Sequence, residues 1–455
     1  MTTQAVTTQA VTTLTTQAPV TSTPRVIGDY QSDRHGPTLI VIGGIHGNEP
    51  AGIIAARRIL DRLGQDRPEP FAGRIVALAG NLTALDHEDR HLRYVDTDLN
   101  RIWAPDSVHQ ARQSPESQRS TEQREMLELL DVIETERAGA HGSVYVLDLH
   151  SVSSDSPPFV FVEDSLPARR LAMRFEIPII LGFEEELAGL LVDYCTNTLG
   201  LTSLLIEGGL HDDPQTADAL EHAIRIALDA IGAWPIDRAY DGPSPRIALD
   251  RSSRGHGRLV YDVRYRYAIM HEHFRIDPHL HAFDPVRREQ TVIAIDGDRP
   301  VTAPIHGLLF LPNRQPRALP GDDGFFIVRR VGRLWLRLSA TLRSMGLVHR
   351  LLPLLAPGVS RHPDHPHRLV IDPDLAAALK REVFHLLGYR ILKQGADHSM
   401  SRRRRVSQAL LAASRAATGA LVNRIRGRHV PLVDREDAWV VGRRRLDIQS
   451  LRHNP

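Results

Sequence analysis

The sequence predicts an α/β fold with a mixed, largely parallel sheet flanked by helices, followed by an appended small β domain and a mostly helical C-terminal extension. Three observations support this prediction. Apolar runs alternate with helical spacing up to about residue 231, short runs punctuated by proline and glycine follow, and the chain from about residue 335 is rich in Leu and Arg. Strands that alternate with helices are typical of α/β domains.

The expected strands of the α/β part are continuous apolar runs, as in strands that are buried on both faces of a parallel sheet. They lie at 38–42, 74–79, 144–149 and 201–206. Residues with helical spacing predict helices between these strands at 51–63 and 121–137, and after the last strand at 214–231. The short strands expected in the small β domain are 258–267, 291–295, 306–311 and 325–331.

The chain of 455 residues is long enough for two or three domains. We expect a disordered Thr/Gln-rich tail at 1–25, where the pentapeptide TTQAV occurs twice, because such a composition offers little to bury. The expected domains are 30–235, called here the α/β part, and 245–334, the small β domain, joined by a proline-containing linker at 235–245. Residues 335–455 form the Arg/Leu-rich extension.

Composition limits the classes of function. The net charge is +1, so no overall field favours nucleic acid. No stretch is apolar enough to span a membrane, and the first residues do not resemble a signal peptide, so we expect a cytoplasmic protein. The single cysteine, Cys195, excludes an internal disulfide and a metal site built on several thiolates. Any metal must therefore be held by His, Asp or Glu.

His46 and Glu49 follow the first expected strand in a loop with glycines at 43, 44 and 47. An imidazole and a carboxylate suit zinc, and two or three protein ligands with an open position make a catalytic site. The alternative is a solvated pair of loop residues, because a His-x-x-Glu spacing also arises by chance. His150 favours the metal site, since it follows another expected strand and strand ends of a parallel sheet meet at one edge. Alternatively, His150 simply caps its strand.

Other polar side chains sit at corresponding places. Glu207 ends the strand at 201–206 and precedes two glycines, as expected of a general base, although a capping or ion-paired Glu would look the same. We expect Asp148 and Asp98 to orient the metal ligands without binding the metal themselves. The alternative for Asp148 is a buried, hydrogen-bonded structural acid. The loop 93–101 supplies two arginines and an amide, whose donors could bind a substrate carboxylate or stabilise a developing oxyanion. The alternative is a surface loop of ion pairs that contribute little to stability.

Together these segments resemble the succinylglutamate desuccinylase/aspartoacylase family of the zinc carboxypeptidase superfamily, over roughly residues 35–332. The motifs that carry the resemblance are GIHGNEPAG at 44–52, RYVDTDLNR at 93–101, DLHS at 148–151, IEGG at 206–209, FDPV at 283–286 and APIHG at 303–307.

The resemblance implies a carboxypeptidase-like fold and one zinc ion per chain, bound by His46, Glu49 and His150. It also implies that Glu207 activates a zinc-bound water for attack on an amide carbonyl. By the same match, Arg93 assists at that carbonyl and Asn100 and Arg101 bind a substrate carboxylate. Members of the family remove acyl groups from N-acylated amino acids or act on related small amides.

Three departures from the family pattern concern the substrate rather than the metal. Asn81 is followed by Leu instead of Pro, residues 193–205 contain no arginine, and Gly324 is followed by two phenylalanines where aspartoacylases use a tyrosine. We therefore predict hydrolysis of an N-acyl amino acid or related amide, with the acyl group and the amine left open. One alternative is a peptidase of the same superfamily; a β domain that covers the cleft would instead favour small substrates. The other alternative is a non-enzymatic binding protein.

The C-terminal extension matches no family that we can name. Its arginines within 402–428 would form a solvated face or a homo-oligomer contact, or would bind an acidic partner such as an anionic lipid, with nucleic acid a weaker expectation. The His/Pro stretch at 362–367 could hold a second metal, although such loops are more often merely exposed.

Overall fold

The computed structural model describes residues 23–66, 68, 70–236, 244–315, 318–344, 352–353, 358–363, 368–372, 387–393 and 439–443. The expected tail, the arginines within 402–428 and most of the His/Pro stretch lie outside the described residues. Most of the expected linker at 235–245 also lies outside the described residues. Its C-terminal end, Pro245, is the first residue of a short helix.

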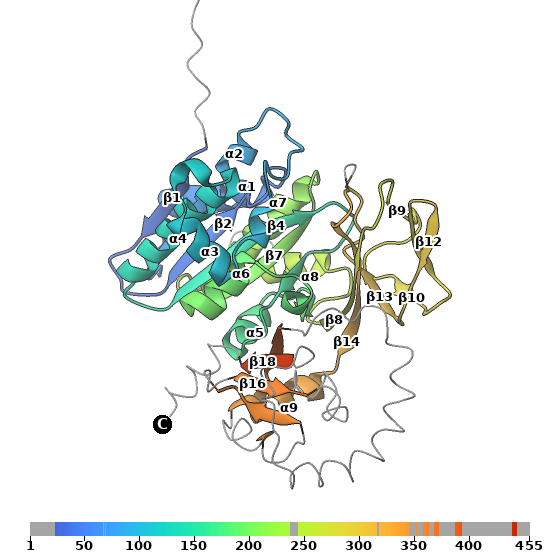
Figure 1. Cartoon of the computed structure of the whole chain (residues 1–455). Helices are drawn as coiled ribbons and strands as arrows, with labels where there is room; N and C mark the ends of the chain where they lie inside the picture. The colour runs from blue at the N-terminus through green and yellow to red at the C-terminus, as the bar shows by residue number, and fades with distance from the viewer. Residues whose placement is uncertain are drawn as a thin grey trace, which may run out of the picture.

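The core of the fold is one sheet of eleven described strands (Figure 1). Its strands, in spatial order, are β1 (Val26–Gln31), β3 (Arg74–Ala79), β2 (Thr38–Gly43), β4 (Val144–Val152), β7 (Thr202–Leu210), β5 (Phe159–Phe161), β6 (Ile179–Leu181), β8 (Val260–Ala268), β14 (Asp323–Val331), β13 (Gly307–Phe310) and β10 (Pro285–Val286). β3, β2, β4 and β7 run parallel to one another, and β5, β6 and β8 form a second parallel group. The prediction of a mixed, largely parallel sheet flanked by helices is confirmed.

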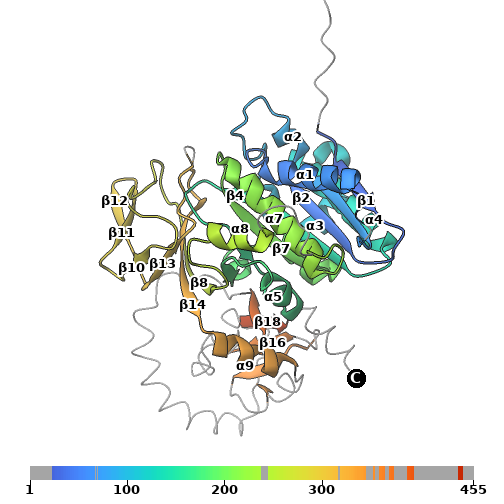
Figure 2. The same ribbon diagram turned by 180° about the vertical axis from the view of Figure 1, so that it is seen from behind.

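Helices cover both faces of the parallel part of the sheet, so its strands are buried on both sides. Alternate residues of β2 show this directly: Leu39 and Val41 belong to one core, whereas Ile40 and Ile42 belong to the other. Figures 1 and 2 show the two helical layers from opposite sides. The helices up to residue 252 are α1 (Ala51–Asp66), α2 (Leu82–Leu85), α3 (Pro105–Gln113), α4 (Thr121–Gly139), α5 (Leu166–Ala172), α6 (Leu191–Tyr194), α7 (Pro214–Ala230) and α8 (Pro245–Ser252), with short η1 (Leu99–Arg101), η2 (Glu116–Gln118), η3 (Phe183–Glu185) and η4 (Cys195–Leu199).

The expected small β domain continues the main sheet. β8 pairs with β6 of the α/β part on one side and with β14 on the other, so β8, β14, β13 and β10 extend the same sheet. A separate three-stranded sheet of β9 (Arg275–Ile276), β11 (Val292–Asp296) and β12 (Arg299–Thr302) packs beside them. In this sheet the two short strands β5 and β6 separate β8 from β7.

The described part of the C-terminal extension differs from the mostly helical structure that we expected. It contains the helix α9 (Arg333–Ser344) and an antiparallel sheet of four strands, β15 (Val359–Arg361), β16 (Arg368–Ile371), β18 (Trp439–Arg443) and β17 (Tyr389–Lys393). The strands are short apolar runs within a sequence dominated by Leu and Arg, whose composition favours helices. Pairing between strands up to about seventy residues apart therefore overrides local preference.

Helix α9 packs against the α/β part near α5 (Figure 1). The Arg343 guanidinium, whose side chain is fully buried, donates to the Asp164 carbonyl oxygen at 2.5 Å and lies 3.3 Å from its carboxylate. Arg169 of α5 donates to Ser339 of α9 at 3.2 Å. Helix α9 of the extension is thus joined to the α/β part by buried and partly buried polar contacts.

Candidate metal centre

His46 and Glu49 lie in the loop between β2 and α1, and His150 lies in the adjacent strand β4. Two glycines shape this loop. Gly44 has a φ of +71°, which favours glycine, and a Cβ on Gly47 would come within 2.5 Å of the Ala84 carbonyl oxygen. Because β2 and β4 are parallel neighbours, their ends bring the loop and His150 together.

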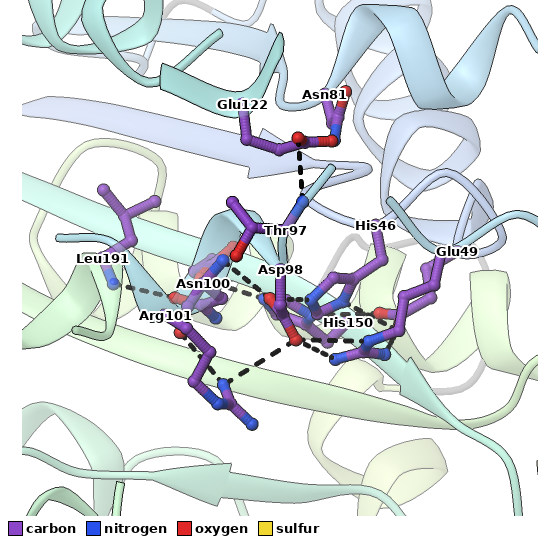
Figure 3. A network of polar contacts seen from close by, with 12 residues as sticks. His46, Glu49, Asn81, Thr97, Asp98, Asn100, Arg101, Glu122, His150 and Leu191 are labelled. Atoms are coloured by element: carbon purple, nitrogen blue, oxygen red, sulfur yellow. Dashed lines mark hydrogen bonds and ion pairs between the residues drawn. The ribbon is translucent and has the colours of Figure 1, made fainter. Parts of the chain in front are cut away.

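The Glu49 carboxylate lies between the two imidazoles (Figure 3). Its Oε1 is 2.9 Å from Nδ1 of His46, and its Oε2 is 3.0 Å from Nδ1 of His150. All three side chains are buried, and one ligand atom from each lies within 4.8 Å of the others. The three candidate ligands predicted from sequence are therefore brought together.

The opposite nitrogen of each imidazole faces an aspartate. Nε2 of His46 is 3.0 Å from Oδ1 of Asp98. Nε2 of His150 is 3.0 Å from Oδ2 of Asp148, which is close enough for an ion pair but lacks the alignment of a hydrogen bond. In the metal-free protein each Nδ1 faces an oxygen of Glu49 as a donor. With a metal bound, carboxylates in these places would hold Nε2 protonated and leave the Nδ1 lone pair for the metal. This is the arrangement in which zinc-binding histidines are held.

The donor set fits zinc. Two imidazole nitrogens and one carboxylate, with no further His, Cys, Asp or Glu in the same group among the described residues, match the three-ligand pattern of catalytic zinc sites. Burial by itself would raise the pKa of Glu49, but the attraction of His46 and hydrogen bonds from both histidines hold it well below the usual value. The carboxylate is thus ionised, as a ligand must be.

Arg93 reaches the centre from the loop that precedes η1. Its guanidinium donates to Oε1 of Glu49 at 2.9 Å and to Oδ2 of Asp98 at 3.2 Å. The side chain keeps 25% of its surface exposed, whereas Glu49 keeps 2%. Arg93 therefore lies at the boundary between the buried ligands and the accessible side of the site, where a carbonyl oxygen could approach it.

Asn100 and Arg101 differ in their surroundings (Figure 3). Asn100 is buried, and its side-chain oxygen accepts a hydrogen bond of 2.8 Å from the Leu191 backbone, so the residue ties η1 to α6. The Arg101 guanidinium is partly exposed, lies 4.0 Å from Asp98 and donates to Asp323 of β14 at 3.0 Å. Of the two, Arg101 is the one with donors on the accessible side.

Glu207 lies inside β7 rather than at its end, because β7 extends to Leu210. It pairs in register with His150, so the two side chains are cross-strand neighbours on one face of the sheet. Its Oε2 is buried and has no hydrogen-bond partner among the described residues. Burial raises the pKa of Glu207 well above the usual value, and the charge of His150 offsets this only in part. A carboxyl with a raised pKa beside the ligands suits general acid–base chemistry.

Sequence reasoning missed Glu122 of α4, which positions the loop with Arg93 and Asp98. Its buried carboxylate accepts hydrogen bonds from the backbone N–H groups of Val95, Asp96 and Thr97 at 2.7, 3.0 and 3.1 Å. An amide of Asn81 donates to it at 3.1 Å. The only signal was an acidic residue in the first turn of an expected helix, and that position is usually explained by the helix dipole.

Two more residues near the centre were also missed. Nδ1 of His211, which follows β7, lies 2.7 Å from the hydroxyl of Ser151, and the Ser151 backbone N–H donates to Oε2 of Glu49 at 3.1 Å. Ser151 stands in the DLHS motif, but nothing in the sequence places His211 beside it. Asp323 is the other missed residue, because its large distance along the chain from Arg101 hides their contact.

Residues 35–230 match the family model of the succinylglutamate desuccinylase/aspartoacylase catalytic domain. A succinylglutamate desuccinylase/aspartoacylase structure from Rhodobacter sphaeroides is 21% identical, covers 66% of this chain and 87% of its own, and has a TM-score of 0.48. Succinylglutamate desuccinylase from Vibrio cholerae is 19% identical (66% and 83% covered, TM-score 0.47). The product-bound ectoine utilization protein EutE of Ruegeria pomeroyi is 16% identical (66% and 87%, TM-score 0.47). No curated protein sequence matches the chain.

Proposed function

From the premise that the chain belongs, through residues 35–230, to the succinylglutamate desuccinylase/aspartoacylase family, we propose that it is a zinc-dependent deacylase. It cleaves the amide bond of an N-acylated amino acid or a related small amide. The observation that carries this proposal is the convergence of His46, Glu49 and His150, with an aspartate behind each histidine.

One zinc ion per chain is the cofactor that we propose, held by these three side chains. When bound, zinc supplies Lewis-acid polarisation of the substrate carbonyl and lowers the pKa of a water molecule. The aspartates support this choice of metal because they orient both imidazoles with Nδ1 toward Glu49.

Glu207 is the proposed general base. It takes the proton of the attacking water and then passes that proton to the leaving amine, so one carboxyl serves both halves of the reaction. Its burial beside His150 and its raised pKa support this role, since a carboxyl that holds a proton more tightly is the better base and can return the proton.

Arg93 and Arg101 are the proposed substrate contacts. Arg93 would donate to the oxyanion that develops at the attacked carbonyl, from a position 2.9 Å from Glu49. Arg101 would bind a carboxylate of the substrate through its partly exposed guanidinium. Asn100 supports this grip by holding η1 in place through Leu191.

Contacts between the β part and the site favour a small substrate over a peptide. Arg101 is paired to Asp323 of β14, and the Arg314 backbone N–H lies 3.4 Å from the Ser153 hydroxyl, just beyond β4. An extended peptide would have to pass these contacts. The presence of Glu207 and all three candidate ligands argues against a binding protein that has lost its activity.

Among the described residues, no helix has an apolar stretch of the length that a membrane span requires. A cytoplasmic location and a homo-oligomer stay predictions.

The test is a hydrolysis screen of N-acetyl, N-succinyl and longer N-acyl amino acids with zinc-loaded protein, read as release of the free amine. We expect turnover of at least one N-acyl amino acid, loss of turnover after chelation and recovery with added zinc. Cleavage of peptides combined with no cleavage of N-acyl amino acids would replace the deacylase with a peptidase.

A further inference from the structure

Asp323 joins two arginines that come from different parts of the chain. It stands at the start of β14, and its Oδ2 accepts from Arg101 of η1 at 3.0 Å while its Oδ1 accepts from Arg266 of the neighbouring strand β8. The Asn313 side chain donates to the Asp323 carbonyl oxygen at 2.8 Å and fixes the backbone there. The three charged side chains are therefore held as one unit, called here the Arg101–Asp323–Arg266 clamp.

The clamp lies close to the candidate metal ligands. Arg101 is 4.0 Å from Oδ2 of Asp98, and the other oxygen of Asp98 is 3.0 Å from Nε2 of His46. A small molecule whose carbonyl lies at the metal centre would thus have its far end near the clamp. Arg101, Asp323 and Arg266 keep 31%, 19% and 30% of their side-chain surfaces exposed, compared with 3% for His46, so a solute can reach them.

The balance of charge in the clamp favours one anionic group. Within the clamp, two guanidiniums and one carboxylate leave a single excess positive charge, and the nearby Asp98 carboxylate is already paired with Arg93. The two oxygens of Asp323 and the Asn100 carbonyl oxygen engage only part of the ten N–H donors that two guanidiniums offer, by the usual count of five each. The free donors can bind one further carboxylate in forked geometry. A second carboxylate on the same molecule would be repelled by the Asp323 carboxylate, because the clamp has no further excess positive charge to compensate it.

We propose that the clamp binds the single carboxylate of an N-acyl amino acid with an uncharged side chain, and that Asp323 discriminates against dicarboxylic substrates. The proposal rests on the proposed deacylase function and narrows its substrate class. Arg266 and Asp323 are specificity-determining residues in this assignment, and they act on substrate binding rather than on the bond that is broken.

The test measures binding by calorimetry with the zinc-loaded Glu207→Gln protein, which removes the proposed base and so separates binding from turnover. The probes are N-acetylalanine, its uncharged amide and N-acetylaspartate. We expect N-acetylalanine to bind at least about 10-fold more tightly than its amide, the change that accompanies one charged hydrogen-bonded contact. Adding Arg266→Ala should abolish that ratio, Arg266→Lys should restore part of it, and Asp323→Asn should shift preference toward N-acetylaspartate by about 10-fold.

Arg58→Ala is the matched control, because Arg58 forms an exposed ion pair with Asp218 on α1 and α7, away from the clamp. Ratios in Arg266→Ala and Asp323→Asn equal to those of the control would overturn the proposal, as would equal binding of N-acetylalanine and its amide. Turnover of N-acyl amino acids with these unchanged ratios would leave the deacylase standing and remove only the clamp. If the binding ratios change as expected but the parent protein hydrolyses no N-acyl amino acid, the proposed deacylase function is wrong and the clamp stands as a binding site.

Discussion

Asp148 provides the sharpest test of how the centre is prepared for a metal. Its carboxylate is fully buried, and its Oδ2 lies 3.0 Å from Nε2 of His150, on the far side of the ring from Glu49. Asp148→Asn keeps the size of the side chain but removes its charge. The imidazole would then be less firmly held with the proton on Nε2 and the lone pair on Nδ1.

The size of the effect follows from this contact. Loss of a carboxylate behind a zinc-binding histidine weakens metal affinity by roughly 10- to 100-fold. We therefore expect the zinc dissociation constant of Asp148→Asn to rise by that factor, about 1.4 to 2.7 kcal/mol. The stability of the metal-free protein is measured as well, because the substitution also removes the buried ion-pair partner of His150, and a general loss of folding would lower zinc binding without any orienting role.

The assay is competition for zinc with a chelator of known affinity, together with urea unfolding of the metal-free protein. Asp96→Asn is the control, because Asp96 lies in the same loop as Asp98 but its carboxylate accepts from the Thr121 backbone instead of a histidine. Zinc affinity in folded Asp148→Asn equal to that of the control would refute the role given to Asp148.

The remaining predictions concern stability. Arg343→Leu should lower the free energy of unfolding by roughly 3 kcal/mol, because it removes one of the two guanidiniums beside the buried Asp164 carboxylate and leaves that of Arg169. Arg58→Ala breaks an exposed ion pair and should lower the free energy of unfolding by about 1 kcal/mol or less. Equal urea midpoints for the two variants would contradict this. Burial raises the pKa of Glu125, but hydrogen bonds from Thr83 and the charge of Arg25 outweigh it and lower the pKa below its ordinary value of 4.5. Since the folded pKa is depressed, the contribution of Glu125 is present above pH 4.5 and is lost as pH falls through the folded pKa. Urea unfolding over a pH series should therefore show a shallower acid loss of stability in Glu125→Gln than in the parent, and parallel curves would contradict it.

The parallel strands and their helices could be predicted from sequence because burial on both faces produces long apolar runs. β2, β3, β4 and β7 lie where expected, although β4 and β7 run farther and place His150 and Glu207 inside strands. Short strands such as β5 and β6 were not predicted, because three apolar residues carry no detectable period.

The ligands could be predicted because His46, Glu49 and His150 stand in compact motifs beside strand ends. The groups that orient them depend on contacts between distant segments. Glu122 reaches the loop at 95–97 from α4, and Asp323 reaches Arg101 from β14, 222 residues away along the chain. No local pattern encodes such pairs, so the clamp could be found only in the folded chain.

The central claim is a zinc site served by Glu207, and one measurement tests it most directly: the zinc content and the turnover number of the parent and Glu207→Gln, prepared in parallel. The account predicts one zinc per chain in both proteins and a turnover number at least about 100-fold lower in the variant, the usual contribution of a general base. Parent protein that cannot bind stoichiometric zinc would contradict the metal centre. Equal turnover in the two proteins would contradict the role of Glu207.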